Sequence, residues 1–395
     1  MWRVLVIHRS KVSLRILSAM VFSFSFVLAI AGHISSGPHV SYAAGTGEKS
    51  AKKGHKVLYG FDTAYINLAV TAKINPRTGG FASFTVGAVP FFPNSPAVAV
   101  NGSYLYISNS FIKGIANNGS QIFGYSIDSS DGTLTALPGS PFFKFKPPIS
   151  IQGLAPTPDG RFLYGADASG HIYAFKVDSQ TGIPKQISGS PFASGANQQL
   201  VVDPTGKFLY ASDDNPPGGV LAFTIDSRGR LSPVPGSPFP VPDPSFLTSS
   251  QPYGIVDTGS FVYVALSASD RIAAFSVDSG TGALTPVPGS PFAAGSVPAN
   301  FALAGNFLYV VNPGDGTVSG YSIDAGSGAL TPIPGSPFGA GGETISMDPS
   351  GKYLFLGTFK GIQGYDVDPD TGVLALGAAK AGENGALFLT TVQLP

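Results

Sequence analysis

The stretch Phe275–Phe292, FSVDSGTGALTPVPGSPF, decides the fold because near-copies of it recur along the 395-residue chain. Copies begin at Tyr125, Phe175, Phe223 and Tyr321, a shortened copy begins at Tyr365, and a degenerate copy begins at Ala72. The stretch predicts a strand that runs to Asp278, a tight turn, and a second strand that ends in Gly-Ser-Pro-Phe. Such repetition indicates units that bury their apolar faces against their neighbours.

A second marker precedes each copy and usually has an aromatic residue at its third position. It occurs as Val57-Leu58-Tyr59, Tyr104-Leu105-Tyr106, Phe162-Leu163-Tyr164, Phe208-Leu209-Tyr210, Phe261-Val262-Tyr263, Phe307-Leu308-Tyr309 and Tyr353-Leu354-Phe355. Each of these seven units has room for four short strands separated by turn residues. The chain is therefore expected to be an all-β, seven-bladed β-propeller with four antiparallel strands per blade.

The two ends of the repeat complement each other. The first unit begins at the Val57-Leu58-Tyr59 marker and lacks its first strand, whereas an extra apolar run, Ala386–Leu389, follows the last unit. We expect residues 386–391 to supply the missing strand, because this pairing closes the ring and leaves no sheet edge exposed there.

The N-terminal residues differ from the repeat. Four basic residues, the last of them Arg15, precede the uncharged apolar run Ile16–Ala31, a pattern typical of an export signal. We divide the chain into an export signal (1–43), a linker (44–56) and the propeller (57–395). Cleavage after Ala31 or Ala43, or an uncleaved anchor, are alternatives. We expect a periplasmic or extracellular protein with no stable membrane association after cleavage.

Composition narrows the classes of partner. Lys plus Arg and Asp plus Glu both number 23, so the net charge is zero, and there is no cysteine. This balance gives no electrostatic reason to expect nucleic acid as a partner, and disulfides are excluded. We expect a monomer whose partner, a small molecule or a protein, binds the loop face of the central channel.

Several motifs resemble a known family. Asp159–Tyr164 and Val277–Leu284 resemble the repeat of the lactonase-type seven-bladed propellers, which include 6-phosphogluconolactonases and cycloisomerase-like enzymes. Leu308–Asn312, followed by Gly316–Val318, resembles the Tyr-Val-Thr-Asn repeat of related surface and periplasmic propellers. The resemblance covers about residues 57–394. It implies a propeller fold, with His, Arg and Glu in the central cleft when the protein is an enzyme.

Alignment of the repeats on the second marker predicts a set of polar residues at the mouth of the central channel. Its members are Asn94, Gln152, Gln198, Glu343 and Glu383, with Gln251 one residue out of register and Asn300 near the position that Val297 occupies. One interpretation is a ring that binds a small oxygenated ligand or a cation. The plainer alternative is that these side chains only satisfy loop backbone groups.

Four residues are candidates for catalysis. Glu343 and Glu383 fall in equivalent positions of adjacent units and could serve as general bases. His171 lies in a loop beside Asp167, and Arg271 could hold an anion or an oxyanion. The simpler interpretation of His171 and Arg271 is that they are solvated side chains in loops.

The sequence predicts no metal site and no cofactor. The calcium-loop-like stretch Asp366–Gly372 has Gly377 where a bidentate glutamate is needed, and neither a nucleophile elbow nor a zinc motif occurs. Two functions stay open: an exported binding scaffold, or a metal-independent lactone hydrolase or isomerase similar to 6-phosphogluconolactonase. Whether the protein is an enzyme is not decided by the sequence.

Overall fold

The computed structural model describes residues 56–61, 68–88, 98–108, 121–143, 151–167, 169–193, 195, 199–213, 218–242, 252–339, 341–358, 360–381 and 388–394. The expected export signal (1–43) and all but the last residue of the expected linker (44–56) lie outside these residues. In the part of the chain that the structure describes, no helix has the length and apolar character needed to cross a membrane.

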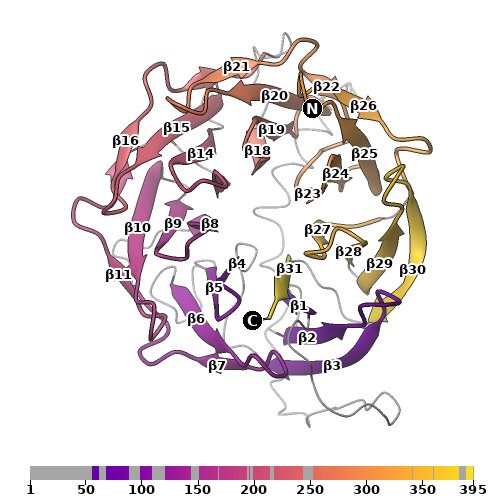
Figure 1. Ribbon diagram of the computed structural model, residues 1–395, viewed down its shortest axis with the longest axis horizontal. Coiled ribbons are helices and arrows are strands. Elements are labelled where there is room, and N and C mark those ends of the chain that lie inside the picture. Colours follow the sequence, from indigo (N-terminus) through magenta and orange to yellow (C-terminus); the bar gives the residue numbers. More distant parts are fainter. Residues whose placement is uncertain are drawn as a thin grey trace, which may run out of the picture. The chain divides into compact units, whose positions relative to one another are not determined.

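Seven β-sheets stand as blades around a central axis, as Figure 1 shows. Each blade has four main strands, here called a to d from the axis outward, and neighbouring strands are antiparallel. Three blades carry an additional two-residue strand that pairs with strand c. The expected all-β, seven-bladed propeller is confirmed.

The strands of each blade, in the order a to d, have the following bounds. Blade 1 consists of β31 (Phe388–Gln393), β1 (Lys56–Phe61), β2 (Leu68–Ile74) and β3 (Phe81–Ala88). Blade 2 consists of β4 (Val98–Val100), β5 (Tyr104–Ser108), β6 (Ile122–Ile127) and β7 (Leu134–Ala136). Blade 3 consists of β8 (Ile151–Pro156), β9 (Phe162–Asp167), β10 (His171–Val177) and β11 (Pro184–Gln186), with β12 (Phe192–Ala193). Blade 4 consists of β13 (Leu200–Val202), β14 (Phe208–Asp213), β15 (Gly219–Ile225) and β16 (Leu231–Pro233), with β17 (Phe239–Pro240).

The remaining three blades follow the same order. Blade 5 consists of β18 (Pro252–Asp257), β19 (Phe261–Leu266), β20 (Arg271–Val277) and β21 (Leu284–Pro286), with β22 (Phe292–Ala293). Blade 6 consists of β23 (Phe301–Ala304), β24 (Phe307–Asn312), β25 (Thr317–Ile323) and β26 (Leu330–Pro332). Blade 7 consists of β27 (Thr344–Met347), β28 (Tyr353–Thr358), β29 (Gly361–Val367) and β30 (Leu374–Ala381).

The C-terminal strand closes the ring, as the sequence predicts. β31 pairs antiparallel with β1, with Phe388 opposite Phe61 and Gln393 opposite Lys56. The described part of this strand is Phe388–Gln393, and residues 386 and 387 of the expected strand lie outside the described residues. Lys56, the last residue of the expected linker, is already part of β1, and its Nζ lies 2.9 Å from Oδ2 of Asp348 in blade 7.

In blades 1 to 6, the tyrosine of the second marker joins the blade to the next one. Tyr263 on β19 is fully buried, and its hydroxyl donates to the carbonyl oxygen of Gly328 in blade 6 at 2.9 Å. We call this contact the tyrosine staple. The same staple joins Tyr59 to Gly132, Tyr106 to Gly182, Tyr164 to Gly229, Tyr210 to Gly282 and Tyr309 to Gly372. A polar end on a large apolar ring thus sets the spacing of neighbouring blades.

The stapled glycine is required at the c–d turn. Gly328 has φ +75°, and a Cβ on it would collide with the ring of Phe261, the first residue of the blade 5 marker. A residue with a side chain would meet both a strained backbone and an occupied space. The Phe-Leu-Tyr marker and the Asp-x-x-x-Gly turn are therefore two halves of one contact between blades.

The interface between blades 7 and 1 lacks the staple. Phe355 occupies the tyrosine position on β28, is fully buried, and stacks on Phe81 of blade 1 with ring centroids 5.8 Å apart. Tyr353 instead donates to the carbonyl oxygen of Pro76 at 3.3 Å. The junction that the C-terminal strand closes is thus held by a different set of contacts from the other six.

The c–d turns are stabilised by their own carboxylates. Oδ1 of Asp278 accepts hydrogen bonds from the backbone N–H of Gly280 and Thr281, at 2.9 and 2.8 Å. These bonds, led by the one from Thr281, lower the pKa of the exposed Asp278 carboxyl. The expected side-chain-to-backbone bonding of these turns is confirmed.

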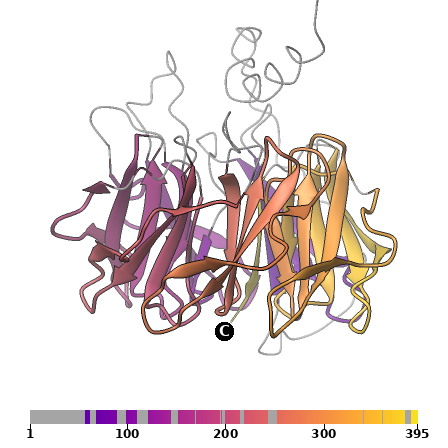
Figure 2. The same ribbon diagram turned by 90° about the horizontal axis from the view of Figure 1, so that it is seen from above.

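Both kinds of tight turn lie at one edge of the blades. In blade 5, Asp257 pairs with Val262 and Phe261 pairs with Ser276, so the a–b turn and the c–d turn share one end of the sheet. We call this end the turn face and the opposite end the loop face. Figure 2 shows the sheets from the side, with the turns along one edge of the ring. Each strand a therefore runs from the loop face to the turn face.

Candidate functional site

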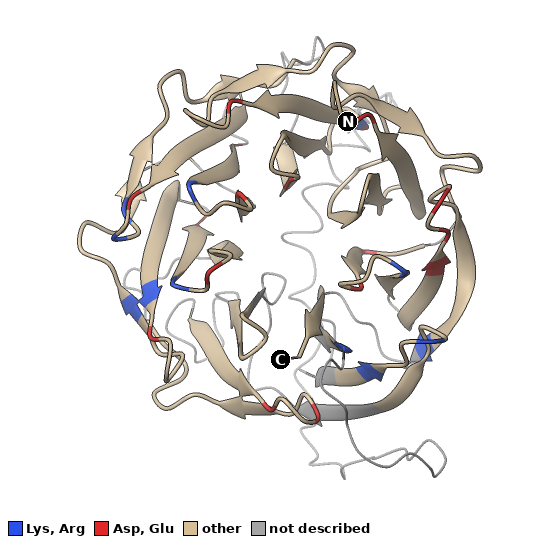
Figure 3. Cartoon of the chain, viewed as in Figure 1, with Lys and Arg blue, Asp and Glu red and all other residues tan. Residues whose placement is uncertain are grey.

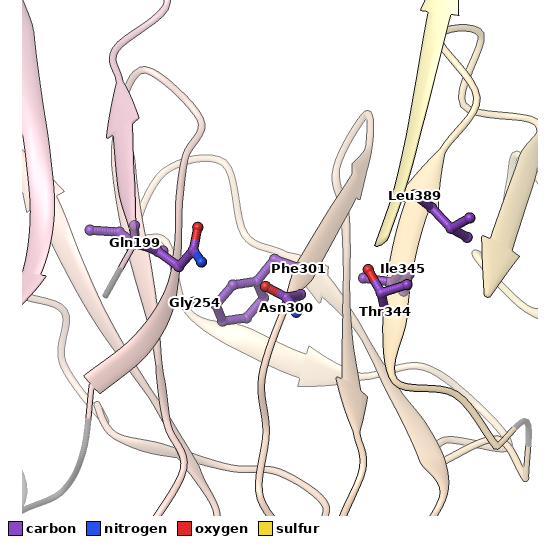
Figure 4. Close-up of a pocket in the computed structure, with 8 residues that line it drawn as sticks. Gln199, Gly254, Asn300, Phe301, Thr344, Ile345 and Leu389 are labelled. Atoms are coloured by element: carbon purple, nitrogen blue, oxygen red, sulfur yellow. The ribbon is translucent and has the colours of Figure 1, made fainter. Parts of the chain in front are cut away.

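A cavity of about 150 Å³ lies in the central channel, and strands of five blades contribute to its wall. It is lined by Gln199, Gly254, Ile255, Asn300, Phe301, Thr344, Ile345 and Leu389 (Figure 4). These residues stand at or near the beginning of their strands a, so the cavity lies toward the loop face. Its volume corresponds to about five water molecules at roughly 30 Å³ each, which fits one small molecule.

The lining combines neutral polar groups with apolar ones. Gln199 and Asn300 supply amides and Thr344 supplies a hydroxyl, whereas Ile255, Phe301, Ile345 and Leu389 supply hydrocarbon surface. The amide of Gln199 also donates to the carbonyl oxygen of Gln152 in blade 3 at 3.1 Å, which fixes its direction. A wall of this composition suits an uncharged ligand that has both polar groups and apolar surface.

Of the residues expected in the polar ring, the structure brings Asn300 into the cavity wall and places Gln152 on β8, next to it through Gln199. Three others, Asn94, Gln198 and Gln251, lie outside the described residues. Gln199 and Thr344, which follow the predicted Gln198 and Glu343 by one residue, line the cavity. Asn300 is thus the predicted ring residue that lines the cavity among the described residues, and Gln199 and Thr344 are direct neighbours of predicted ones.

Glu343 lies directly beside the lining. It is half-buried, its N–H donates to the carbonyl oxygen of Gly357 at 2.8 Å, and Thr344 follows it. Burial raises the pKa of its carboxyl. A carboxylate with a raised pKa near a cavity is a candidate acid or base. Its expected partner, Glu383, lies outside the described residues.

His171 is paired with an acid but stands apart from the cavity. Its Nδ1 lies 3.5 Å from Oδ1 of the fully buried Asp167, which also accepts hydrogen bonds from the N–H groups of Ser169 and His171. The imidazole is 41% exposed. Because β9 separates β10 from β8, His171 is not on an innermost strand.

Arg271 is also remote from the cavity. It begins β20, is exposed, and its guanidinium donates to the carbonyl oxygen of Pro291 at 3.4 Å. The neighbouring Asp270 carboxylate accepts from the N–H of Val297 at 2.8 Å, so it fixes the loop between blades 5 and 6. The structure thus does not bring Arg271 and Glu343 together in one cavity.

A buried acid that was not predicted from the sequence lies at the turn face. Asp257 ends β18 and is 7% exposed; its Oδ1 accepts from the N–H of Gly259 at 2.6 Å, and its Oδ2 has no hydrogen-bond partner. Burial raises the pKa of its carboxyl to about 6, opposed by the Gly259 bond and assisted by the charge of Asp203. Asp203 instead bonds the N–H groups of Thr205 and Phe208 with its two oxygens. The one-residue shorter a–b turn after Asp257 is visible in the sequence and explains the difference.

Among the described residues, no group of three or more His, Cys, Asp or Glu side chains could hold a metal ion.

Comparison with known proteins shows what this chain is similar to. A family model described as Lactonase, 7-bladed beta-propeller, matches residues 254–343. The resemblance to the lactonase family is confirmed. The 6-phosphogluconolactonase of Yersinia pestis (strain Pestoides F) is 29% identical over 126 residues, which are 31% of this chain and 33% of that protein. The lactonase-like chain thus matches about a third of the length of these curated relatives.

Solved structures confirm the propeller architecture of this lactonase-like chain. The periplasmic gluconolactonase of Pseudomonas aeruginosa superposes with a TM-score of 0.68 at 17% identity, over 87% of this chain and 99% of that one. A protein of unknown function from Desulfotomaculum acetoxidans gives 0.62 at 14% identity, over 85% and 98%. At these identities the likeness concerns the fold, and one fold hosts many functions.

Proposed function

We propose that this chain is an exported lactonase-like propeller that binds a small, oxygen-rich ligand at the mouth of its central channel. The observation that carries the proposal is the cavity lined by Gln199, Asn300 and Thr344 from three different blades. Two amides and one hydroxyl, at or just before the first residue of an innermost strand, line a space large enough for one small molecule. Convergent polar groups in a largely apolar pocket are the usual form of a small-molecule site.

The charges of the described residues favour an uncharged ligand. Lys and Arg positions are scattered around the ring in Figure 3 and do not gather in one sector. None of the eight lining residues is charged, and the neighbouring Glu343 would repel an anion. Recognition of a phosphate normally uses Arg or Lys at close range. We therefore propose that the ligand of this cavity is not phosphorylated.

Titration calorimetry with a panel of small polyols, sugars and lactones tests the proposal. Gln199→Ala and Thr344→Ala should each weaken binding of a panel compound roughly five- to tenfold, the value of one hydrogen bond lost from a buried site. Gln186→Ala on the outer strand β11 is the matched control and should leave affinity unchanged. A parent protein that binds none of the panel would refute the proposal.

Lactone hydrolysis is a second candidate, and the raised pKa of Glu343 favours it. In this scheme the Glu343 carboxylate takes a proton from water, and the resulting hydroxide adds to the lactone carbonyl carbon. The ring C–O bond then breaks, and the proton passes to the leaving oxygen to give the hydroxy acid. The amide of Asn300, which lines the cavity, is better placed than Arg271 to donate to the oxyanion.

A panel of five- and six-membered lactones distinguishes the two candidates. If Glu343 or Glu383 is the base, replacement by Gln should reduce hydrolysis roughly a hundredfold or more, with little change in melting temperature. In the parent the rate should rise with pH through the raised pKa of Glu343 and then level off. Activity that survives both substitutions would exclude the assignment, and absence of activity in the parent would leave the binding function alone.

Export, a monomeric state and the absence of a nucleic-acid partner belong to the same proposal. Export rests on the basic residues that precede the apolar run Ile16–Ala31. A protein partner at the loop face would compete with the small ligand for the channel mouth. Size-exclusion chromatography with light scattering on the mature protein tests the monomeric state.

A further inference from the structure

The innermost strands repeat one apolar position around the channel. It is the residue of strand a that pairs with the residue directly after the second marker. In six blades this position holds Leu154, Leu200, Ile255, Phe301, Ile345 and Leu389, opposite Gly165, Ala211, Val264, Val310, Leu356 and Gly60. Five of these six residues are aliphatic, and Phe301 is the one aromatic residue.

The packing of the propeller blades does not require an aromatic residue at this position of strand a. Leu154, Leu200, Ile345 and Leu389 fill it in other blades and are 3–6% exposed. Phe301 is only partly buried, packs with one side against the core between blades 5 and 6, and lines the cavity. An aliphatic side chain would serve the core equally well, so the aromatic face is available for another purpose.

Gly254 is the neighbour of Phe301 in the cavity wall. A Cβ on it would collide with the carbonyl oxygen of Ala299. The glycine at position 254 therefore lets the backbone just before Phe301 approach β18 closely. Figure 4 shows Phe301 beside Gly254, with the Asn300 side chain next to it and Thr344 across the cavity.

We infer that Phe301 is a specificity-determining platform on which a cyclic, uncharged polyol ring lies flat. The inference rests on the proposed binding function of the cavity. The C–H groups on one face of such a ring meet the electron-rich face of the phenyl group, while its hydroxyls reach the amides of Gln199 and Asn300 and the hydroxyl of Thr344. An open-chain polyol also offers hydroxyls to these groups but has no rigid C–H face.

Titration of the full-length protein with two matched probes tests the inference. We use 1,5-anhydro-D-glucitol, which is cyclic and has no reactive carbonyl, and D-glucitol, which is its open-chain counterpart. The parent should bind the cyclic probe at least tenfold more tightly. Phe301→Leu introduces the leucine found at the equivalent position of other blades. It should weaken the binding of the cyclic probe about three- to tenfold and leave the affinity for the open-chain probe unchanged. Phe301→Tyr should retain the preference.

Controls separate this inference from the function on which it rests. Leu154→Ile alters the equivalent position of blade 3, which is not among the lining residues, and should leave the preference for the cyclic probe intact. Thermal unfolding should show that Phe301→Leu is folded. Equal affinity of parent and Phe301→Leu for the cyclic probe would overturn the platform while leaving the binding function standing. If the parent binds neither probe nor any compound of the wider panel, the binding function and the platform both fail.

Discussion

The tyrosine staple makes a quantitative prediction about the junctions between blades. Tyr263→Phe removes one hydroxyl and keeps the ring, so the packing of the fully buried side chain should not change. The lost bond is 2.9 Å long, and it leaves the carbonyl oxygen of Gly328 buried without a partner. Removing one member of a buried hydrogen bond costs about 1–3 kcal/mol of unfolding free energy. We expect a loss in that range.

Urea unfolding, followed by circular dichroism, measures this loss, and Tyr104→Phe is the matched control. The hydroxyl of Tyr104 lies 3.5 Å from its acceptor at an exposed site, so its removal should cost less than about 0.5 kcal/mol. Tyr164→Phe combined with Tyr309→Phe alters junctions that share no blade, so the two losses should add. If Tyr263→Phe is indistinguishable from Tyr104→Phe, the staple does not stabilise the junction and the reasoning is wrong.

Three further predictions concern closure, a buried acid and processing. Deleting residues 384–395 removes β31 and leaves the inner edge of β1 unpaired, so stability should fall by several kcal/mol; an unchanged melting temperature would contradict ring closure. The folded protein holds a proton on Asp257 that the unfolded chain has released between about pH 4 and 6, so stability should decline as pH rises through this range. Asp257→Asn should abolish that decline and add up to about 3 kcal/mol at pH 7, and an unaltered pH dependence of the melting temperature would exclude a raised pKa. Trp2 is the only tryptophan, so the exported protein, cleaved after Ala31 or Ala43, should show tyrosine emission only; tryptophan emission, or an intact mass near 40.5 kDa, would indicate a retained N-terminus.

Most of the fold can be predicted from the sequence because its determinants are local and repeated. The Asp278 turn bonds its own backbone, and the Phe-Leu-Tyr marker meets the turn of the next blade in each stapled junction. Even the exception at closure is visible as Phe355 in the place of a tyrosine. Local signals that recur in each unit reinforce one another. This consistency explains why the predicted strand order and the predicted closure of the ring agree with the structure.

The candidate site could be predicted less well, because it depends on the part of each blade that does not repeat. Strand a has a register shift between Ile151 and Gly153 in blade 3, and another between Pro252 and Ile255 in blade 5. Alignment on a marker in strand b cannot place such shifts, and a one-residue error exchanges the side of the strand that a residue faces. Phe301 was overlooked because a phenylalanine in a strand is expected to be core.

Ring closure also fixes the order of events when the protein is made. The strand that completes blade 1, β31, follows all the other described strands in chain order. Until it emerges, whether from a ribosome or from a translocation pore, β1 keeps an open edge and the first and last blades cannot be held together. Long-range pairing of this kind slows folding far more than it costs in stability. A propeller whose ring is closed by its last strand therefore stays open until that strand has been made.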